Sequence, residues 1–324
     1  MTTSNDAPLR FDSLAVHAGR EDFEALGVHA SPIDFSSTNP LPGVESGGDA
    51  YERMATGGDI GDGSAVYQRL WNPTVARFEG ALAALEGAEA AVAFASGMAT
   101  VTAVIMAAKQ RRGSHVVALR PLYGGTDHLL ATGLLGTETT FVDAVEHVER
   151  AVRADTGLVV AETPGNPTLE LVDLEALVAA AGDAPVLIDN TFATPVLQRP
   201  LDHGVALSLH SATKYIGGHG DVLGGVVACD EEWAQALRPI RAITGAIAHP
   251  MSAYLMHRGL QTLPLRVRAQ QAGAQQVAEA LGAMPGVREV RYPGLEGCDP
   301  AGLVGAGRQM RGPGSMISID VGSY

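Results

Sequence analysis

The sequence predicts an α/β fold, in which helices cover both faces of a mostly parallel sheet. The first observation is the pattern between Asn72 and about residue 243, where short apolar runs alternate with amphipathic stretches. This alternation is typical of βαβ units. The second is size, because 324 residues with 46% hydrophobic content can bury a large core. We therefore expect one large domain with a smaller partner.

The first 60 residues lack sustained periodicity, and the Gly-rich segment from Gly43 to Gly63 favours an arm and loops. Asn72-Pro73 is typical of a helix start, and Gly87 lies beyond the expected helix end at Leu85. Seven apolar runs then predict strands, at 91–95, 115–119, 139–142, 157–162, 184–189, 205–210 and 224–228. Helices are expected at 97–110, 124–135, 144–153, 173–181 and 231–243.

The C-terminal part begins with a long helical stretch from Pro250 to about Met284, interrupted at Pro264. Two strands follow, at 287–292 and 315–321, and two strands cannot form a stable layer alone. We therefore expect the second domain to be incomplete. The predicted division is an N-terminal arm with loops (1–60), a large ligand-binding domain (61–249) and a linking helix with a small α+β domain (250–324).

Composition excludes several classes of protein. A net charge of −14 disfavours nucleic-acid binding, which needs a basic face. The two cysteines, Cys229 and Cys298, form no CxxC pair, so neither a disulfide framework nor a thiolate metal site is expected. The uncharged stretch from 90 to 108 is broken by Ser96-Gly97 and predicts a strand and a helix rather than a membrane span. No basic and then apolar segment opens the chain, so we expect a cytoplasmic protein.

Lysine is scarce, since only Lys109 and Lys214 stand among the 22 basic residues. Lys109 belongs to a cationic helix end before a glycine, where positive charge suits the helix dipole. Lys214 lies in a polar turn that directly follows an apolar strand. Arginine stays protonated and cannot act as an amine nucleophile, so a chain that forms an imine must keep a lysine. Lys214 is therefore a candidate nucleophile, although a solvated surface charge is the alternative.

Polar side chains follow the carboxyl ends of four other predicted strands, where doubly wound sheets bind their ligands. They are Ser96-Gly97-Met98 at a helix start suited to phosphate, Tyr123 before two glycines, Asn166 between prolines after Glu162, and Asp189 at the end of a buried strand. The hydroxyls of Ser211 and Thr213 flank Lys214. Taken singly, Tyr123 could be an ordinary surface tyrosine in a tight turn, and Asn166 could simply form a turn beside proline.

One cofactor needs all of these groups at once. Pyridoxal 5'-phosphate (PLP) has an aldehyde for an amine, a ring nitrogen for a carboxylate, a phenolic oxygen, a flat face and a phosphate. The agreement of five strand ends favours a PLP site over the separate alternatives. A nucleotide-binding α/β protein is disfavoured, because the sequence has neither a Gly-Lys P-loop dipeptide nor a Gly-x-Gly-x-x-Gly run after an early strand.

Across nearly its whole length, the sequence also resembles the Cys/Met-metabolism family of PLP-dependent enzymes. This family includes cystathionine γ-synthase, cystathionine γ- and β-lyases, methionine γ-lyase and the acylhomoserine sulfhydrylases. The resemblance is carried by residues 67–74 (YQRLWNPT), 95–98 (ASGM), 122–126 (LYGGT), 162–167 (ETPGNP), 189–191 (DNT), 210–215 (HSATKY) and 258–263 (RGLQTL).

The resemblance implies fold type I, with a seven-stranded type of sheet, and a role for each site residue. Lys214 would bind the cofactor aldehyde and then move protons, Asp189 would pair with the ring nitrogen, Tyr123 would stack on the ring and take part in proton transfer, and Asn166 would contact the phenolic oxygen. Gly97, Met98, Ser211 and Thr213 would bind the phosphate. Tyr67 and Arg69 would reach it from a neighbouring subunit, which implies a homodimer or homotetramer with shared active sites.

The implied activity is γ-elimination or γ-replacement on sulfur or O-acyl amino acids, as in transsulfuration and in cysteine and methionine metabolism. The Tyr-Gly-Gly-Thr run resembles cystathionine γ-lyase and γ-synthase, and cystathionine γ-lyase is the first expectation. The alternatives are cystathionine γ-synthase, another γ-lyase such as methionine γ-lyase, and a non-catalytic PLP-binding relative. Gly125 stands where methionine γ-lyases typically carry a cysteine, which disfavours that alternative. Relatives continue past the 315–319 run with an arginine for the substrate carboxylate, so no residue here is assigned that role.

Overall fold

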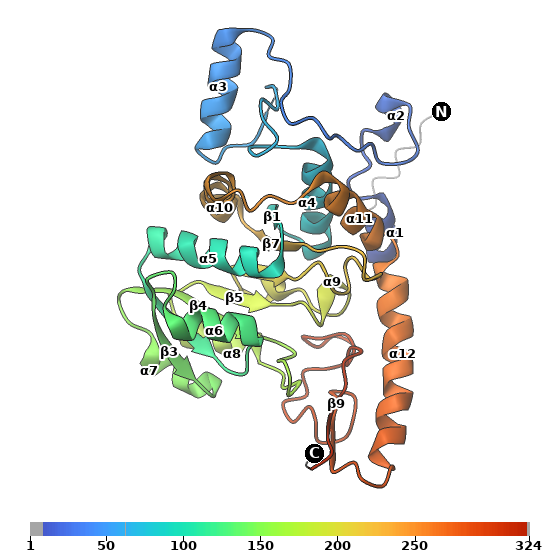
Figure 1. The fold of residues 1–324 in the computed structure, drawn as a ribbon. Helices are drawn as coiled ribbons and strands as arrows, with labels where there is room; N and C mark the ends of the chain where they lie inside the picture. The colour runs from blue at the N-terminus through green and yellow to red at the C-terminus, as the bar shows by residue number, and fades with distance from the viewer. Residues whose placement is uncertain (1–8, 62, 323–324) are drawn as a thin grey trace.

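The structure, a computed structural model, describes residues 9–61 and 63–322. A seven-stranded sheet with the order β1-β7-β6-β5-β4-β2-β3 forms its centre (Figure 1). The strands are β1 (Ala90–Phe94), β2 (His115–Leu119), β3 (Glu138–Val142), β4 (Thr156–Glu162), β5 (Val186–Asp189), β6 (Leu207–His210) and β7 (Gly225–Cys229). Only the pairs that include β7 are antiparallel. The prediction of an α/β fold with a mostly parallel sheet is confirmed.

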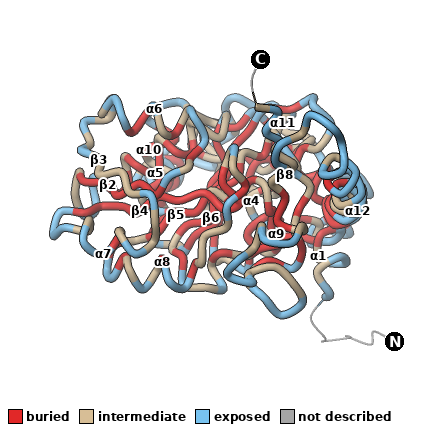
Figure 2. The backbone as a smooth tube through the Cα atoms, turned by 90° about the horizontal axis from the view of Figure 1, so that it is seen from below, coloured by how far each residue is buried: buried red, intermediate tan, exposed pale blue. Residues whose placement is uncertain are grey.

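Helices cover both faces of this sheet, as the view along its edge shows (Figure 2). One face carries α5 (Gly97–Arg111), α6 (Gly124–Thr132) and α10 (Glu231–Thr244), and the other carries η1 (Val145–His147), α7 (Val148–Ala151) and α8 (Leu174–Ala181). Strands β1, β2, β4, β6 and β7 are buried along their whole length. Burial on both faces explains why β1 and most of β2, β4 and β7 are continuous apolar runs rather than alternating ones.

The helix expected after Asn72 is α4 (Pro73–Glu86). The Asn72 side chain accepts from the amides of Thr74 and Val75, at 3.0 and 3.2 Å, and Gly87 ends the helix in the left-handed conformation. The packing of α4 against β1 and α11 (Pro250–Leu260) places the chain after Tyr67 beside the sheet.

The N-terminal part is more helical than its sequence predicts. It contains α1 (Phe11–His17), α2 (Phe23–Leu26) and α3 (Val44–Ala55). The expectation of loops is wrong for the segment that forms α3, which lies at the far end of the molecule from the C-terminus (Figure 1). Ala50 and Met54 of α3 are buried in a cluster with Leu70 and Ala242. This packing outweighs the helix penalty of the two glycines inside α3.

The C-terminal part consists of α11, α12 (Leu263–Gly282) and a two-stranded antiparallel sheet of β8 (Glu289–Arg291) and β9 (Ser318–Asp320). The predicted long helical stretch is broken just before α12, with Pro264 inside its first turn. Two short elements, α9 (Thr194–Leu197) and η2 (Pro200–His203), follow β5. Among the described residues, no helix is both long and apolar enough to cross a membrane.

Candidate active site

A pocket of about 660 Å³ lies at the carboxyl ends of the parallel strands. Eight of the ten predicted site residues line it: Gly97, Met98, Tyr123, Asn166, Asp189, Ser211, Thr213 and Lys214. Its other lining residues include Glu162, Thr191, Phe192, Leu223, Gln270 and Met316. Tyr67 and Arg69 are outside the lining of this pocket. The structure therefore brings residues from five strand ends around one cavity.

Lys214 is exposed in the turn that follows β6. Three backbone bonds fix this turn, from the amides of Lys214, Gly217 and Gly218 to the carbonyls of Ser211, Ala212 and Lys214, at 3.0, 2.8 and 2.8 Å. The other lysine is engaged elsewhere, because Lys109 Nζ donates to the carbonyls of Leu135 and Gly136 at 3.0 and 2.9 Å. Lys214 is thus the lysine that the pocket presents to a ligand.

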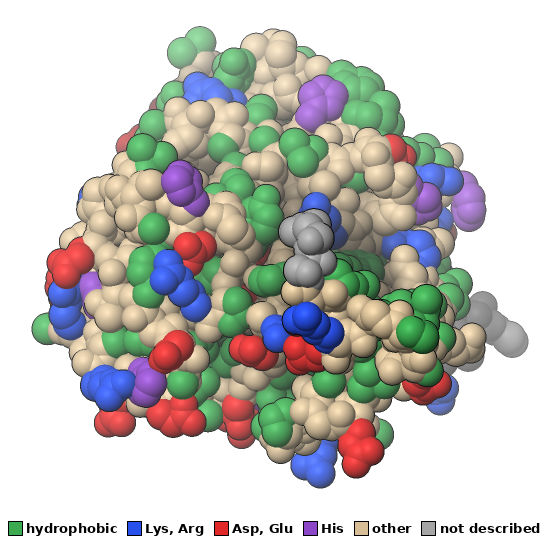
Figure 3. Space-filling view, turned by 60° about the horizontal axis from the view of Figure 1, so that its bottom comes forward, with side chains coloured by type: hydrophobic (Ala, Val, Ile, Leu, Met, Phe, Trp, Pro, Cys, Tyr) green, Lys and Arg blue, Asp and Glu red, His purple; other side chains and the backbone are tan. Residues whose placement is uncertain are grey.

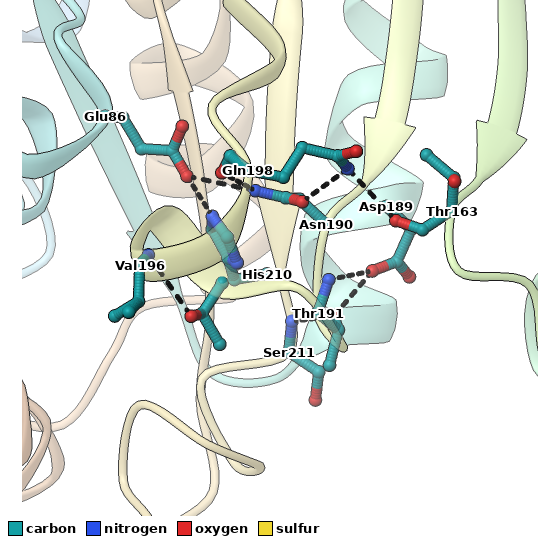
Figure 4. Close-up of polar contacts among 10 residues, drawn as sticks. Glu86, Thr163, Asp189, Asn190, Thr191, Val196, Gln198, His210 and Ser211 are labelled. Atoms are coloured by element: carbon teal, nitrogen blue, oxygen red, sulfur yellow. Dashed lines mark hydrogen bonds and ion pairs between the residues drawn. The ribbon is translucent and has the colours of Figure 1, made fainter. Parts of the chain in front are cut away.

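Asp189 ends β5 and faces the pocket. Its Oδ1 accepts from the Thr191 amide at 3.1 Å and from Thr191 Oγ1 at 2.5 Å, and Thr191 Oγ1 in turn accepts from the Ser211 amide (Figure 4). Burial raises the pKa of Asp189, while the Thr191 bonds oppose that rise. A cationic ligand group beside Asp189 would offset the cost of burying its charge.

Glu162 is a pocket residue that was not among the predicted site residues. It ends β4 and is the register partner of Asp189 on β5. Its Oε2 accepts from the Tyr123 amide at 2.6 Å. Burial, with a contribution from the Asp189 charge, raises the pKa of Glu162 to about 9. Its position at a strand end was the signal that could have identified it.

A buried polar network supports the strands behind the pocket (Figure 4). His210 Nε2 lies 2.5 Å from Glu86 Oε1, and both side chains are almost fully buried. Asn190 Nδ2 donates to the Gln198 carbonyl, and Gln198 Nε2 donates to Asn190 Oδ1 and to the Thr163 carbonyl. Because Asn190 follows Asp189 and His210 precedes Ser211, these contacts fix the ends of β5 and β6 that carry the site residues.

The N-terminus of α5 forms one end of the pocket. Ser96 caps it by accepting from the Ala99 amide at 3.1 Å, and the first amides of a helix have no intrahelical acceptor. A Cβ on Gly97 would lie 3.0 Å from Ser211 Cβ, so glycine is what lets these segments meet. The Thr213 hydroxyl donates to the Gly224 carbonyl and accepts from its amide, at 3.2 and 3.1 Å. These amides and hydroxyls suit a phosphate.

The Tyr123 side chain is 48% exposed at the start of α6. A Cβ on Gly125 would lie 2.6 Å from Tyr123 Cε1 and 3.1 Å from Met98 Sδ, so glycine lets the ring pack against this helix. Asn166 lies in a loop closed by the bond from the Gly165 amide to the Glu170 carbonyl, at 2.9 Å. Both residues therefore sit on segments that fixed contacts hold against the pocket.

Tyr67 and Arg69 lie next to each other, with the guanidinium 5.3 Å from the centre of the Tyr67 ring. Arg69 Nη1 donates to the Ala242 carbonyl, and Tyr67 is exposed. On the face that Figure 3 draws, the acidic and basic side chains of the described residues are interspersed, with no broad basic area. The pocket itself holds one basic side chain, Lys214, and two carboxyl groups, those of Glu162 and Asp189.

These groups fit PLP. Lys214 supplies the amine for its aldehyde, and Asp189 supplies a buried carboxylate that needs a cation, which a protonated ring nitrogen would be. Tyr123 supplies a flat ring, and the start of α5 with Ser211 supplies donors for a phosphate. Each part of the cofactor has a matching group in the same pocket.

Comparison with known proteins gives a family and close relatives. The model of the family described as Cys/Met metabolism PLP-dependent enzyme matches residues 12–324. The L-methionine gamma-lyase of Brevibacterium sandarakinum is 58% identical over 311 residues, which cover 96% of this chain and 78% of that protein. The L-methionine gamma-lyase of Streptomyces avermitilis is 52% identical over 317 residues, covering 95% and 76%.

The solved structures agree with the sequence comparison. The crystal structure of metB from Corynebacterium glutamicum has a TM-score of 0.84 to this chain at 37% identity. The alignment covers 96% of this chain and 78% of that one.

Proposed function

The chain belongs to the Cys/Met-metabolism family of PLP-dependent enzymes, and from this premise we propose that it is a γ-lyase that acts on L-methionine. Enzymes of this family act on sulfur-containing amino acids, in accord with the predicted γ-elimination or γ-replacement. The single observation that carries the choice of methionine is the 58% identity to the L-methionine gamma-lyase of Brevibacterium sandarakinum.

The choice of methionine reverses the order of preference that the sequence motifs gave. Cystathionine γ-lyase was the first expectation, and methionine γ-lyase was one of its alternatives. The relatives at 58% and 52% identity both carry the methionine name, so they favour that alternative.

Gly125 has a structural reason of its own in this chain. A Cβ there would press on the Tyr123 ring and on Met98 Sδ, at 2.6 and 3.1 Å. A glycine is therefore explained by the packing of Tyr123 in this chain. It does not weigh against methionine as the substrate.

We propose the following roles for the residues of the pocket. PLP, when bound, supplies an aldehyde for amino groups and a protonated ring that withdraws electrons from the substrate Cα. Lys214 Nζ would hold the aldehyde and would move the proton at the substrate Cα. Asp189 keeps the proton on the ring nitrogen. Asn166 orients the ring through its phenolic oxygen.

The phosphate of the cofactor would be held by Gly97, Met98, Ser211 and Thr213. Thr213 can donate to it only by giving up its bond to the Gly224 carbonyl. Tyr67 and Arg69 would complete the same site from a second copy of the chain, so we propose a dimer or tetramer as the active form. Their position outside this chain's own pocket supports that role.

Tyr123 is proposed to transfer a proton as the γ-substituent leaves. Its ring is exposed to the pocket while its amide is held by Glu162 Oε2. Replacement of Tyr123 by Phe should lower kcat by about a hundredfold and leave the cofactor bound. Unchanged turnover in a fully loaded variant would remove Tyr123 from proton transfer.

The proposed function is tested by product analysis. The PLP-loaded protein is given L-methionine, cystathionine, and O-acetylhomoserine with cysteine in separate reactions. Methionine should yield 2-oxobutanoate, methanethiol and ammonia in equal amounts, at the highest kcat/KM of the three. The Lys214→Ala variant should form none of these products.

Two other results would each select a different function. Formation of a thioether from O-acetylhomoserine and cysteine, without methanethiol from methionine, would indicate a γ-synthase. A normal visible absorption band of bound PLP with no product from any substrate would indicate a non-catalytic relative.

A further inference from the structure

The turn that carries Lys214 contains carbonyl groups that accept no hydrogen bond from the amides of the turn itself. The three bonds inside the turn employ the carbonyls of Ser211, Ala212 and Lys214. The carbonyls of Tyr215 and Ile216 come next along the chain. Ile216 is almost fully buried, so its backbone groups need partners within the protein.

Arg266 supplies those partners from α12. Its Nη1 donates to the Tyr215 carbonyl at 2.6 Å, and its Nη2 donates to the Ile216 carbonyl at 3.2 Å. Nη2 also donates to the Gly259 carbonyl near the end of α11, at 2.8 Å, and Nε donates to Thr262 Oγ1 at 3.0 Å. One guanidinium thus joins the lysine turn to the end of α11, where a cation suits the helix dipole.

Two glycines make this approach possible. Gly218 has a φ of +74°, and a Cβ on it would lie 2.1 Å from Arg266 Nη1. A Cβ on Gly259 would lie 2.1 Å from the Ile216 carbonyl oxygen. The guanidinium and the turn are therefore packed against each other from both sides. Any side chain at either position would displace the guanidinium or the turn.

All four acceptors of Arg266 are neutral oxygens rather than carboxylates. The guanidinium therefore depends on these four oxygens for its hydrogen bonds. Two of them, the carbonyls of Tyr215 and Ile216, belong to the lysine turn. The planar guanidinium reaches these oxygens from three separate nitrogens held in one plane, whereas a lysine has a single ammonium nitrogen.

We propose that Arg266 is a positioning residue that fixes the turn of Lys214 and thereby aims the Lys214 amine into the pocket. This inference rests on the proposed role of Lys214 in binding the cofactor. It also implies that α12, which leads to the C-terminal sheet (Figure 1), helps to hold the lysine turn through Arg266.

The test compares Arg266→Met and Arg266→Lys with a control on the same helix. Arg268→Met is the control, because Arg268 is about half exposed and, among the described residues, pairs with Asp12 alone, at 2.6 and 2.7 Å. Hydrogen–deuterium exchange of the segment 213–218 is measured in the cofactor-free protein, together with thermal unfolding. The Kd for PLP is then measured by titration of the visible absorption.

The proposal predicts faster exchange of segment 213–218 in Arg266→Met and a Kd for PLP raised about tenfold or more. Arg266→Lys should fall between Arg266→Met and the wild type, and Arg268→Met should match the wild type in both. A lower melting temperature with unchanged Kd and unchanged exchange in this segment would overturn the proposal. That result would leave Arg266 as a structural tie alone.

Two provisions keep the result decisive. If Arg266→Met does not fold, Arg266→Lys is compared with Arg268→Met, and equal Kd and equal exchange in these two variants would overturn the proposal. If Lys214→Ala still binds PLP with the same absorption band, the proposed role of Lys214 fails instead. The exchange result in the cofactor-free protein does not depend on that role.

Discussion

At the scale of single residues, the pairing of Glu162 with Asp189 governs the electrostatics of the pocket. The two carboxylates end neighbouring parallel strands in register, and burial raises the pKa of both. Two buried carboxylates cannot both keep their charge unless a cation or a proton compensates them. A protonated ring nitrogen beside Asp189 and a proton on Glu162 would meet this requirement together.

Glu162 should make the stability of the cofactor-free protein depend on pH. Its pKa is about 9 in the folded chain and about 4.5 in the unfolded chain, so only the folded state holds the proton between those values. The free energy of unfolding should therefore fall as the pH rises from about 5 to 9. Glu162→Gln should flatten this part of the profile, as measured by urea unfolding at a series of pH values.

Glu170→Gln provides the control, because Glu170 is exposed on the loop that follows Glu162. It should leave the profile of the wild type unchanged. An equal slope in Glu162→Gln and wild type would show that Glu162 does not carry the proton.

The site residues differ in how far the sequence identified them. Lys214, Asp189, Tyr123 and Asn166 follow predicted strands, so the rule that ligands bind at strand ends located them. Arg266 gave no such signal, because it lies on a helix and acts through backbone carbonyls 50 and 51 residues away in the chain. Contacts of that kind depend on the packing of helices, which a local pattern does not encode.

At the scale of secondary-structure elements, α4 links the segment of Tyr67 and Arg69 to the core. Its N-cap Asn72 is 4% exposed, accepts from two amides and donates to the Asp34 carbonyl at 3.0 Å. The cap thus holds both the start of the helix and the arm that precedes it. Asp173 at α8 is a less buried cap, and it accepts from one amide.

Replacement of Asn72 by Ala should lower the free energy of unfolding by about 1–2 kcal/mol, because two helix amides and the Asp34 carbonyl lose their partner. Asp173→Ala should cost less, about 0.5–1 kcal/mol. Urea unfolding of the two variants measures the difference. Equal costs would show that the burial of Asn72 adds nothing to its capping.

The sequence predicted the elements of the sheet well and those of the N-terminal part poorly. The predicted strand at 115–119 has the bounds of β2, since four of its five buried residues, 116–119, make an unbroken apolar run. In α3, two adjacent glycines obscure the helical pattern, and the buried residues are Gly47, Ala50 and Met54. That helix is stabilised by Leu70 and Ala242, which no window of neighbouring residues contains.

At the scale of the whole molecule, His257 joins α11 to the N-terminal part of the chain. It lies on α11, is 2% exposed, and its Nε2 lies 2.9 Å from the Ala18 carbonyl that follows α1. Burial lowers the pKa of His257, with the charges of Arg77 and Arg20 acting in the same direction. A second buried histidine, His115, lies between the hydroxyls of Thr156 and Thr140. Burial lowers its pKa as well.

These histidines should make the protein sensitive to acid. Their pKa values are below the usual 6.5 in the folded state, so the unfolded chain takes up protons first as the pH falls. The free energy of unfolding should drop below about pH 6.5. His257→Gln keeps a donor for Ala18 but cannot titrate, so it should lose less stability between pH 7.5 and 5.5 than the wild type does.

His128→Gln is the matched control, since His128 is exposed on α6. It should follow the wild type over the same interval of pH. An acid loss in His257→Gln as large as that of the wild type would assign the sensitivity to His115 or to other groups.

The central claim is that Lys214 is the amine that holds PLP in this pocket, and covalent mapping tests it most directly. The PLP-loaded protein is reduced with borohydride, digested and analysed by mass spectrometry. Because the sequence contains two lysines, Lys109 and Lys214, a labelled peptide identifies which of them carries the cofactor. The account predicts one phosphopyridoxyl group, on Lys214, and no visible absorption band in Lys214→Ala. A label on Lys109, or a band that survives the loss of Lys214, would contradict it.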